Sequence, residues 1–342
     1  MMRLFILIVF VAVADTTYCQ DDAPEEPRNR IVRVVTVSQH GLRATDESLV
    51  DDTFERLDRA GSFRPDIACL PETFTEGEAE ALPGPTSERI SAWARDHNCY
   101  VVFSIKVRAD GQTFNSAVLV DRRGEIVGRY DKTHPTEGEI DGGICPGPVD
   151  PPVFETDFGK VAMQICFDAN WPDQWRRLKE NGAQIVFFPS AYPAARQVST
   201  QAWMNQFFVV SSTKDRASSI YDIAGDEIAT SGRFQYWAGA ELALDMRLFE
   251  IDFHTRKMRD ILAKYGPKVR IEWYHDDDLV SLASLAPDLT VADLIAEFDL
   301  TPYTAYLERC QQMQDKHRIA AGDKTAGQPS GKSDAATSQI PD

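Results

Sequence analysis

Residues 161–172 read Val161-Ala-Met-Gln-Ile-Cys166-Phe-Asp-Ala-Asn-Trp-Pro172, and this stretch decides how the whole chain is interpreted. The apolar run before Cys166 predicts a buried strand, and Asn170 predicts the cap of a helix over residues 171–180. Cys166 is therefore expected at the rim of a sheet, where functional residues are often held by a rigid scaffold. There it would face the positive N-terminus of that helix. A structural cysteine can end an apolar run in the same way, so this stretch alone leaves both interpretations open.

Two other predicted strands each end close to a charged residue. Residues 66–70 form a short apolar run that ends at Glu72, and residues 125–130 form another that ends at Lys132. A thiol, a carboxylate and an ammonium supply a nucleophile, a proton acceptor and a charge for an oxyanion, which together suffice for acyl transfer through a thioester. Because all three residues follow strands, we expect them to form one site, and such a site is typical of a hydrolase.

These stretches resemble the nitrilase superfamily of carbon-nitrogen hydrolases. The matching segments are Leu70-Pro-Glu-Thr-Phe74, Phe114-Asn-Ser-Ala-Val-Leu-Val-Asp121, Gly124-Glu-Ile-Val-Gly-Arg-Tyr-Asp-Lys-Thr-His134, Phe158-Gly-Lys-Val-Ala-Met-Gln-Ile-Cys166 and Gly182-Ala-Gln-Ile-Val-Phe-Phe-Pro-Ser190. In order and spacing they cover roughly residues 31–253. The resemblance implies an α/β fold, a four-layer α-β-β-α sandwich, with a catalytic triad of Glu72, Lys132 and Cys166.

The family also has a second glutamate, in a loop that ends in Pro-Gly, which is Pro146-Gly147 here. Glu137 and Glu139 both precede this pair. Spacing favours Glu139, which is expected to orient the substrate and to keep Lys132 charged, and Glu137 stays the alternative.

The residues around the cysteine indicate the substrate class. Relatives that hydrolyse nitriles usually continue with Trp-Glu, whereas Phe167-Asp168 follows here, which favours amides or N-carbamoyl compounds. D-amino-acid carbamoylases carry two arginines where this chain has Ala169 and Asn170. Arg196, expected in a loop, is a candidate replacement for that carboxylate clamp, although a solvated surface arginine is the simpler interpretation. We expect no cofactor and no metal.

Other functions remain open on the sequence alone. An acyltransferase of the same fold would pass the thioester to an amine, and a nitrilase or a non-catalytic binding protein would share the same residues. A papain-like protease would need a histidine after the cysteine, and only His254, His275 and His317 follow, all outside the predicted core.

The predicted organisation is a hydrolase domain over residues 31–253, a C-terminal helical extension over 254–319 and a disordered tail over 320–342. Within and just before the extension, helices are expected over 253–265, 290–298 and 301–319 and a strand over 269–274. The two last helices superficially suggest a DNA-binding pair. The chain carries 53 acidic against 36 basic residues, a net charge of −17, so nucleic acid is excluded as a partner. We expect the extension to pack on the core or on a partner subunit, in a homodimer or larger homo-oligomer.

The N-terminal residues predict export. Arg3 precedes an apolar run over residues 4–14, which is too short to span a bilayer but suits a secretory signal peptide over residues 1–19. The mature protein is then secreted or periplasmic, without a membrane span. No lipid anchor is expected at Cys19, because the preceding Tyr18 is bulky. In an oxidising compartment, Cys145 is the residue placed to pair with Cys166 and inactivate the enzyme.

Overall fold

The computed structural model describes residues 31–322. The signal peptide expected over residues 1–19 and residues 323–342 of the expected tail lie outside the described residues. The last helix continues to Ala320, one residue into the segment predicted to be disordered.

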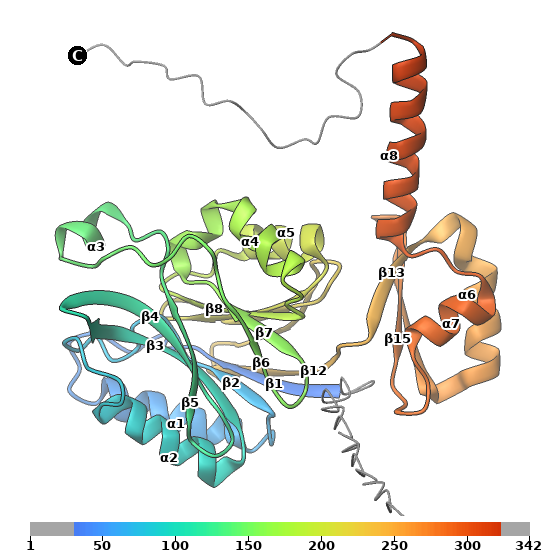
Figure 1. Cartoon of the computed structure of the whole chain (residues 1–342). Helices are drawn as coiled ribbons and strands as arrows, with labels where there is room; N and C mark the ends of the chain where they lie inside the picture. Colours follow the sequence, from blue (N-terminus) through green and yellow to red (C-terminus); the bar gives the residue numbers. More distant parts are fainter. Residues whose placement is uncertain (1–30, 323–342) are drawn as a thin grey trace, which may run out of the picture.

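Two six-stranded mixed sheets form the centre of the molecule (Figure 1). The first has the order β12-β1-β2-β3-β4-β5, formed by β1 (Ile31–Val37), β2 (Ile67–Cys69), β3 (Tyr100–Ala109), β4 (Gln112–Val120), β5 (Ile126–Asp131) and β12 (Trp237–Ala243). The second has the order β11-β10-β9-β8-β7-β6, formed by β6 (Val153–Glu155), β7 (Lys160–Met163), β8 (Ile185–Ser190), β9 (Phe208–Thr213), β10 (Ser219–Tyr221) and β11 (Glu227–Thr230). In both sheets three consecutive strands run parallel and the outer pairings are antiparallel.

Helices cover the outer face of each sheet. In Figure 1, α1 (Leu49–Gly61) and α2 (Pro85–His97) lie below the first sheet, while α4 (Pro172–Glu180) and α5 (Ala195–Asn205) lie above the second. The two inner faces pack against each other in one apolar cluster, and each outer face has its own cluster with its helices. The predicted α-β-β-α sandwich is therefore confirmed.

Strand β1 shows why the central strands carry apolar residues at successive positions. Val32 and Val34 face the second sheet, whereas Val35 and Val37 face the helices of the first layer. A strand buried on both faces needs apolar residues at successive positions, so alternation is lost.

A C-terminal unit follows the sandwich. It consists of a three-stranded sheet in the order β13-β15-β14, formed by β13 (Met246–Glu250), β14 (Val269–Tyr274) and β15 (Leu279–Ser284), with the helices α6 (Ile251–Tyr265), α7 (Val291–Phe298) and α8 (Tyr303–Ala320). One face of this sheet packs with α6 and α7 in an apolar core of its own, whereas Leu248, Leu279 and Ala283 on the other face belong to the central core of the sandwich.

The C-terminal helices expected beyond the sandwich are present, and so is the strand expected over residues 269–274. The unit also contains two strands that were not expected, β13 and β15, and β13 lies before residue 254. Strand β13 pairs with β15, which comes well beyond it in the chain, for example Leu248 opposite Ser281. A pairing between distant segments leaves no local periodicity that would reveal it.

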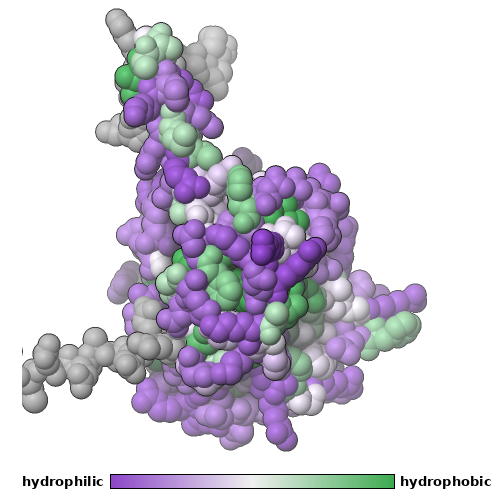
Figure 2. Space-filling view, turned by 90° about the vertical axis from the view of Figure 1, so that its right-hand side faces the viewer, coloured by the Kyte–Doolittle hydropathy of each residue, from purple (hydrophilic) through white to green (hydrophobic). Residues whose placement is uncertain are grey.

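Helix α8 extends away from the rest of the molecule (Figure 1), and none of its residues is buried. Figure 2 views the molecule from the side of this C-terminal unit, where hydrophobic residues gather near the middle of a mainly hydrophilic surface. Within residues 31–322, no helix combines the length and apolar character needed to cross a bilayer.

Candidate active site

The four side chains predicted to act in catalysis come together in one pocket. Glu72 follows β2 and Lys132 follows β5 in the first sheet, while Cys166 follows β7 in the second. Glu139 lies in the short helix α3 (Glu137–Asp141). All four line a cavity of about 280 Å³ between the ends of the two sheets.

Lys132 is the centre of the charged network. Its ammonium donates to Glu72 Oε1 and to Glu139 Oε2, each at 2.8 Å, and its side chain is only 1% exposed. Burial alone would lower the pKa of this ammonium, but Glu72, Cys166 and Glu139 outweigh that effect and raise the pKa above its ordinary value. Lys132 is therefore a fixed positive charge inside the pocket.

Asn115 connects the two carboxylates, and sequence reasoning missed it. Its side-chain amide lies 2.8 Å from Glu72 Oε1 and 2.8 Å from Glu139 Oε1, and donates to both. Ser104 donates to Asn115 Oδ1 at 3.1 Å, which fixes the orientation of the amide. The available signal was a polar residue in the middle of the apolar strand β4, because a buried amide in a strand must find partners.

Glu139, and not Glu137, contacts the lysine. Thr136 caps α3, and its hydroxyl accepts from the Glu139 N–H at 3.3 Å while Glu139 Oε2 accepts from the Thr136 N–H at 2.8 Å. This capping box turns the Glu139 carboxylate back toward Lys132. Glu137 is exposed and lines a different cavity. Glu139 lies in a short helix rather than in the loop that we expected.

Pro146-Gly147 closes the same segment onto Lys132. The Gly147 N–H donates to the Lys132 carbonyl at 2.8 Å. A Cβ at Gly147 would overlap the carbonyl of Asp131, so only glycine allows this close approach.

Cys166 sits in a strained turn. Its φ is +48°, a region that non-glycine residues adopt rarely, and it begins a short 3₁₀ helix, η1 (Cys166–Asn170). The expected helix starts only at Pro172, and Trp171 occupies its cap position. The prediction that Asn170 caps this helix is wrong, because its side chain instead donates to the Phe167 carbonyl at 2.9 Å.

The environment of Cys166 keeps the sulfur protonated. Burial and the nearby Glu72 carboxylate raise the pKa of the thiol to about 12, although Lys132, the Ala191 N–H and the Ser190 hydroxyl act in the opposite direction. We expected the lysine and a helix N-terminus to favour the thiolate. Lys132 acts in that sense, but desolvation is the larger effect.

Asp168 holds the turn in place and was also missed as a functional residue. Its buried carboxylate accepts from the Ile165 N–H at 3.0 Å and from the Tyr130 hydroxyl at 2.7 Å. It also accepts from the His134 N–H at 2.9 Å. Asp168 therefore links the cysteine turn to the segment that follows Lys132.

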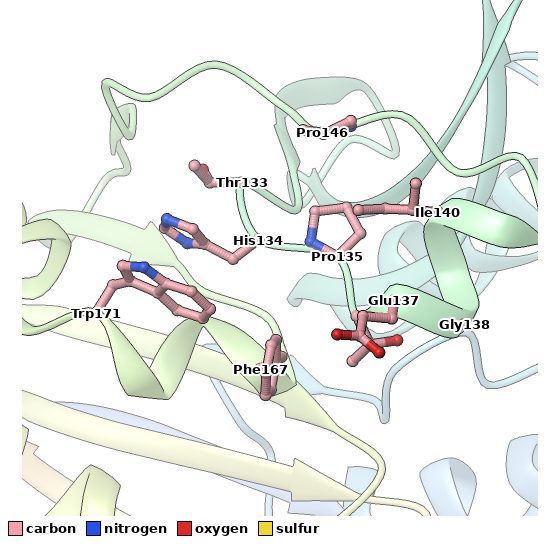
Figure 3. Close-up of a pocket in the computed structure, with 10 residues that line it drawn as sticks. Thr133, His134, Pro135, Glu137, Gly138, Ile140, Pro146, Phe167 and Trp171 are labelled. Carbon is pink, nitrogen blue, oxygen red and sulfur yellow. The ribbon is translucent and has the colours of Figure 1, made fainter. Parts of the chain in front are cut away.

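A larger cavity of about 600 Å³ lies beside the catalytic pocket (Figure 3). The stacked rings of His134 and Trp171 lie on one side of it and Pro135 and Ile140 on the other. None of the predicted catalytic residues lines this cavity, so its greater size does not make it the reaction site. The two cavities adjoin, since Thr136 lines both.

Two further predictions concern residues near the pocket. Cys69, Cys99, Cys145, Cys166 and Cys310 are all free thiols, so the structure contains no pairing of Cys145 with Cys166. Arg196 lies in α5 rather than in a loop, is exposed, and does not line the catalytic pocket.

A four-layer α/β sandwich with this arrangement at its sheet ends is the architecture of the nitrilase superfamily. The chain belongs to the carbon-nitrogen hydrolase family, whose sequence model matches residues 33–246.

Curated relatives match part of the chain. A β-ureidopropionase from Arabidopsis thaliana is 32% identical over 193 residues, which is 49% of this chain and 47% of that protein. An N-carbamoylputrescine amidase from Solanum lycopersicum is 28% identical over 177 residues, 46% of this chain and 59% of that protein. The chain thus spans about half the length of the curated relatives that it matches.

Solved structures support the fold. The crystal structure of an amidase from Nesterenkonia sp. superposes with a TM-score of 0.55 at 20% identity, covering 68% of this chain and 97% of that one. A mutant of this amidase, at 19% identity and a TM-score of 0.55 over 67% of this chain and 96% of that one, shows covalent addition of the acetamide moiety of fluoroacetamide at the active-site cysteine.

Proposed function

We propose that this protein hydrolyses a non-peptide carbon-nitrogen bond in a small amide or N-carbamoyl compound, through a thioester on Cys166. The observation that carries the proposal is the pairing of buried Lys132 with two carboxylates in the pocket that also contains the cysteine. The names of the relatives, a β-ureidopropionase and two amidases, support the same reaction class.

Acylation begins with proton transfer. Glu72 accepts the thiol proton of Cys166, and the sulfur attacks the carbonyl carbon, so that a C–S bond forms as the C=O electrons move to oxygen. The Lys132 ammonium stabilises the resulting negative charge, a contribution of roughly 3 to 4 kcal/mol for a single donor. The C–N bond then breaks, and Glu72 donates its proton to the departing nitrogen.

Deacylation repeats these roles with water. Glu72 deprotonates a water molecule that attacks the thioester carbon, the C–S bond breaks, and the proton returns to the sulfur. Glu139 takes no proton in this scheme. Its contact with Lys132 keeps the ammonium in position while the charge of the Glu72 carboxylate changes.

Ammonia release from a panel of aliphatic amides, N-carbamoyl compounds and nitriles tests this proposal. The wild type should act on amides or N-carbamoyl compounds, and mass spectrometry should find an acyl adduct on Cys166. Cys166→Ala should abolish turnover with the fold intact. Cys310→Ala, which removes a thiol in α8 far along the chain, is the matched control and should retain activity.

Two outcomes would contradict the proposal. One is a wild type that gives neither ammonia nor an adduct with any compound. The other is a Cys166→Ala variant that remains within about tenfold of wild type. If added amine captures the acyl group faster than water does, the protein is an acyltransferase of the same fold.

A further inference from the structure

Three lysine side chains line the catalytic pocket, and two of them are neutralised by protein carboxylates. Lys132 lies between Glu72 and Glu139. Lys214 donates to Glu76 Oε1 at 2.5 Å. These two ammonium groups are therefore held by the protein itself.

Lys106 is different. It lies on β3, is half-buried, and lines the same pocket. Within residues 31–322, no carboxylate forms an ion pair with its ammonium, in contrast to Lys132 and Lys214. A half-buried ammonium beside a cavity favours an anion that enters that cavity, because the charge is partly desolvated.

The register of the sheet directs Lys106 into the site. Lys106 lies directly opposite Asn115 in the antiparallel pair of β3 and β4, so their side chains share a face and their Cβ atoms are about 5 Å apart. Ile105 and Val107 point to the opposite face, into the core beneath the helices. Asn115 is the residue that contacts both glutamates, so Lys106 stands next to the reacting groups.

The charge of the pocket contrasts with that of the protein. The chain has a net charge of −17, whereas the three ammonium groups that line this pocket are balanced by the carboxylates of Glu72, Glu139 and Glu76. Since Lys132 and Lys214 are held by those carboxylates, Lys106 is the lysine of the pocket lining whose charge is available to a small anion that enters the cleft.

We propose that Lys106 binds a free carboxylate of the substrate, so that the substrate class is a small amide or N-carbamoyl compound that also carries a carboxylate. This inference rests on the function proposed above. Lys106 takes the place for which Arg196 was considered, and the volume of about 280 Å³ suits a small acid. Lys106 thus determines specificity and does not touch the bond that breaks.

Matched substrates that differ by one carboxylate test this role. Butyramide and succinamic acid form such a pair, as do propylurea and the corresponding urea that ends in a carboxylate. The wild type should prefer the charged member by about tenfold or more in kcat/KM, the effect of one charged hydrogen bond. Lys106→Met should remove the preference through a higher KM, with kcat within about threefold of wild type. Lys106→Arg should keep part of the preference for the charged substrate.

Arg108→Met is the matched control. Arg108 is exposed on the same strand, two positions along and on the same face, but it does not line the pocket. This variant removes the same charge from the molecule and should leave the preference unchanged.

The outcomes separate this inference from the proposed function. Hydrolysis of neutral and charged members at equal rates would overturn the role of Lys106 and leave the hydrolase proposal standing. An equal loss on both members in Lys106→Met would also overturn it. Calorimetry with Cys166→Ala measures succinamic acid binding without turnover, and unchanged affinity after adding Lys106→Met would contradict the inference even if no substrate is hydrolysed.

Discussion

At the scale of single residues, the proposed mechanism makes Cys166 and Glu72 a pair. With a thiol pKa of about 12, thiolate is scarce at neutral pH, so the sulfur needs a base within the pocket. The carboxylate that raises the thiol pKa is the same group that we propose removes the proton. Proton transfer is then coupled to bond formation with the substrate, and the resting cysteine stays unreactive.

The two candidate glutamates give a direct test at this scale. Glu139 accepts from Lys132, Asn115 and the Thr136 N–H, and a glutamine cannot accept all three bonds. Glu139→Gln should therefore lower kcat/KM by about 10- to 100-fold, measured by ammonia release. Glu137→Gln is the control two residues away and should stay within about threefold of wild type. The opposite pattern would assign the second glutamate to Glu137.

At the scale of elements, short turns and not long helices position the candidate catalytic side chains. The capping box of α3 sets the direction of Glu139, and the turn after β7, in which Cys166 has a positive φ, places the sulfur in the pocket. Each turn is fixed by side-chain bonds to its own backbone, which is the usual role of Thr and Asp at such positions.

Asp168 provides the test for the cysteine turn. Asp168→Asn preserves size but leaves buried donors from the Ile165 N–H, the His134 N–H or Tyr130 without an acceptor, at a cost of about 1 to 3 kcal/mol for each such group. We expect kcat to fall by at least about tenfold at a temperature where circular dichroism shows a folded protein, with KM nearly unchanged.

The control for that experiment is Asp173→Asn, because Asp173 is exposed on α4 and pairs only with Arg176 among the described residues. If Asp168→Asn lowers the melting temperature but leaves kcat intact, Asp168 supports the fold without positioning the cysteine.

At the scale of the whole molecule, one buried hydrogen bond joins the C-terminal unit to the sandwich. The Tyr274 hydroxyl, at the end of β14, donates to Asp222 Oδ2 at 2.7 Å. Asp222 Oδ1 accepts from the N–H groups of Ala224 and Asp226 in the turn after β10. Burial raises the pKa of the Asp222 carboxyl to about 6 despite these bonds.

This raised pKa predicts a pH dependence of stability. The folded state binds the proton more tightly than the unfolded chain, so Asp222 contributes stability at low pH that is lost as the pH rises through about 6. Between pH 4.5 and pH 7.5 the loss is about 2 kcal/mol. Asp222→Asn cannot titrate, so urea unfolding should show wild type losing stability relative to this variant over that interval. A constant difference between the two proteins would refute the assignment.

The sequence by itself determined the fold class and the candidate catalytic residues. Apolar runs predicted buried strands, and the resemblance to the nitrilase superfamily implied the four-layer sandwich. Glu72, Lys132 and Cys166, which follow three of those strands, were expected to act together, and they line one pocket. The burial of a strand and the position of its end depend on neighbouring residues, so these two features are local. The expected export signal lies outside the described residues and stays a prediction.

Only the tertiary structure decided the rest. The contacts of Asn115 with Glu72 and Glu139 join segments that are distant in sequence, and so do the strand pairings of the third sheet. Glu137 lines a different cavity from Glu139, which its sequence position does not reveal. The pKa of Cys166 likewise depends on burial and on a carboxylate from the other sheet. Local periodicity specifies which residues are buried, but the partner that each one meets is set by how the layers dock.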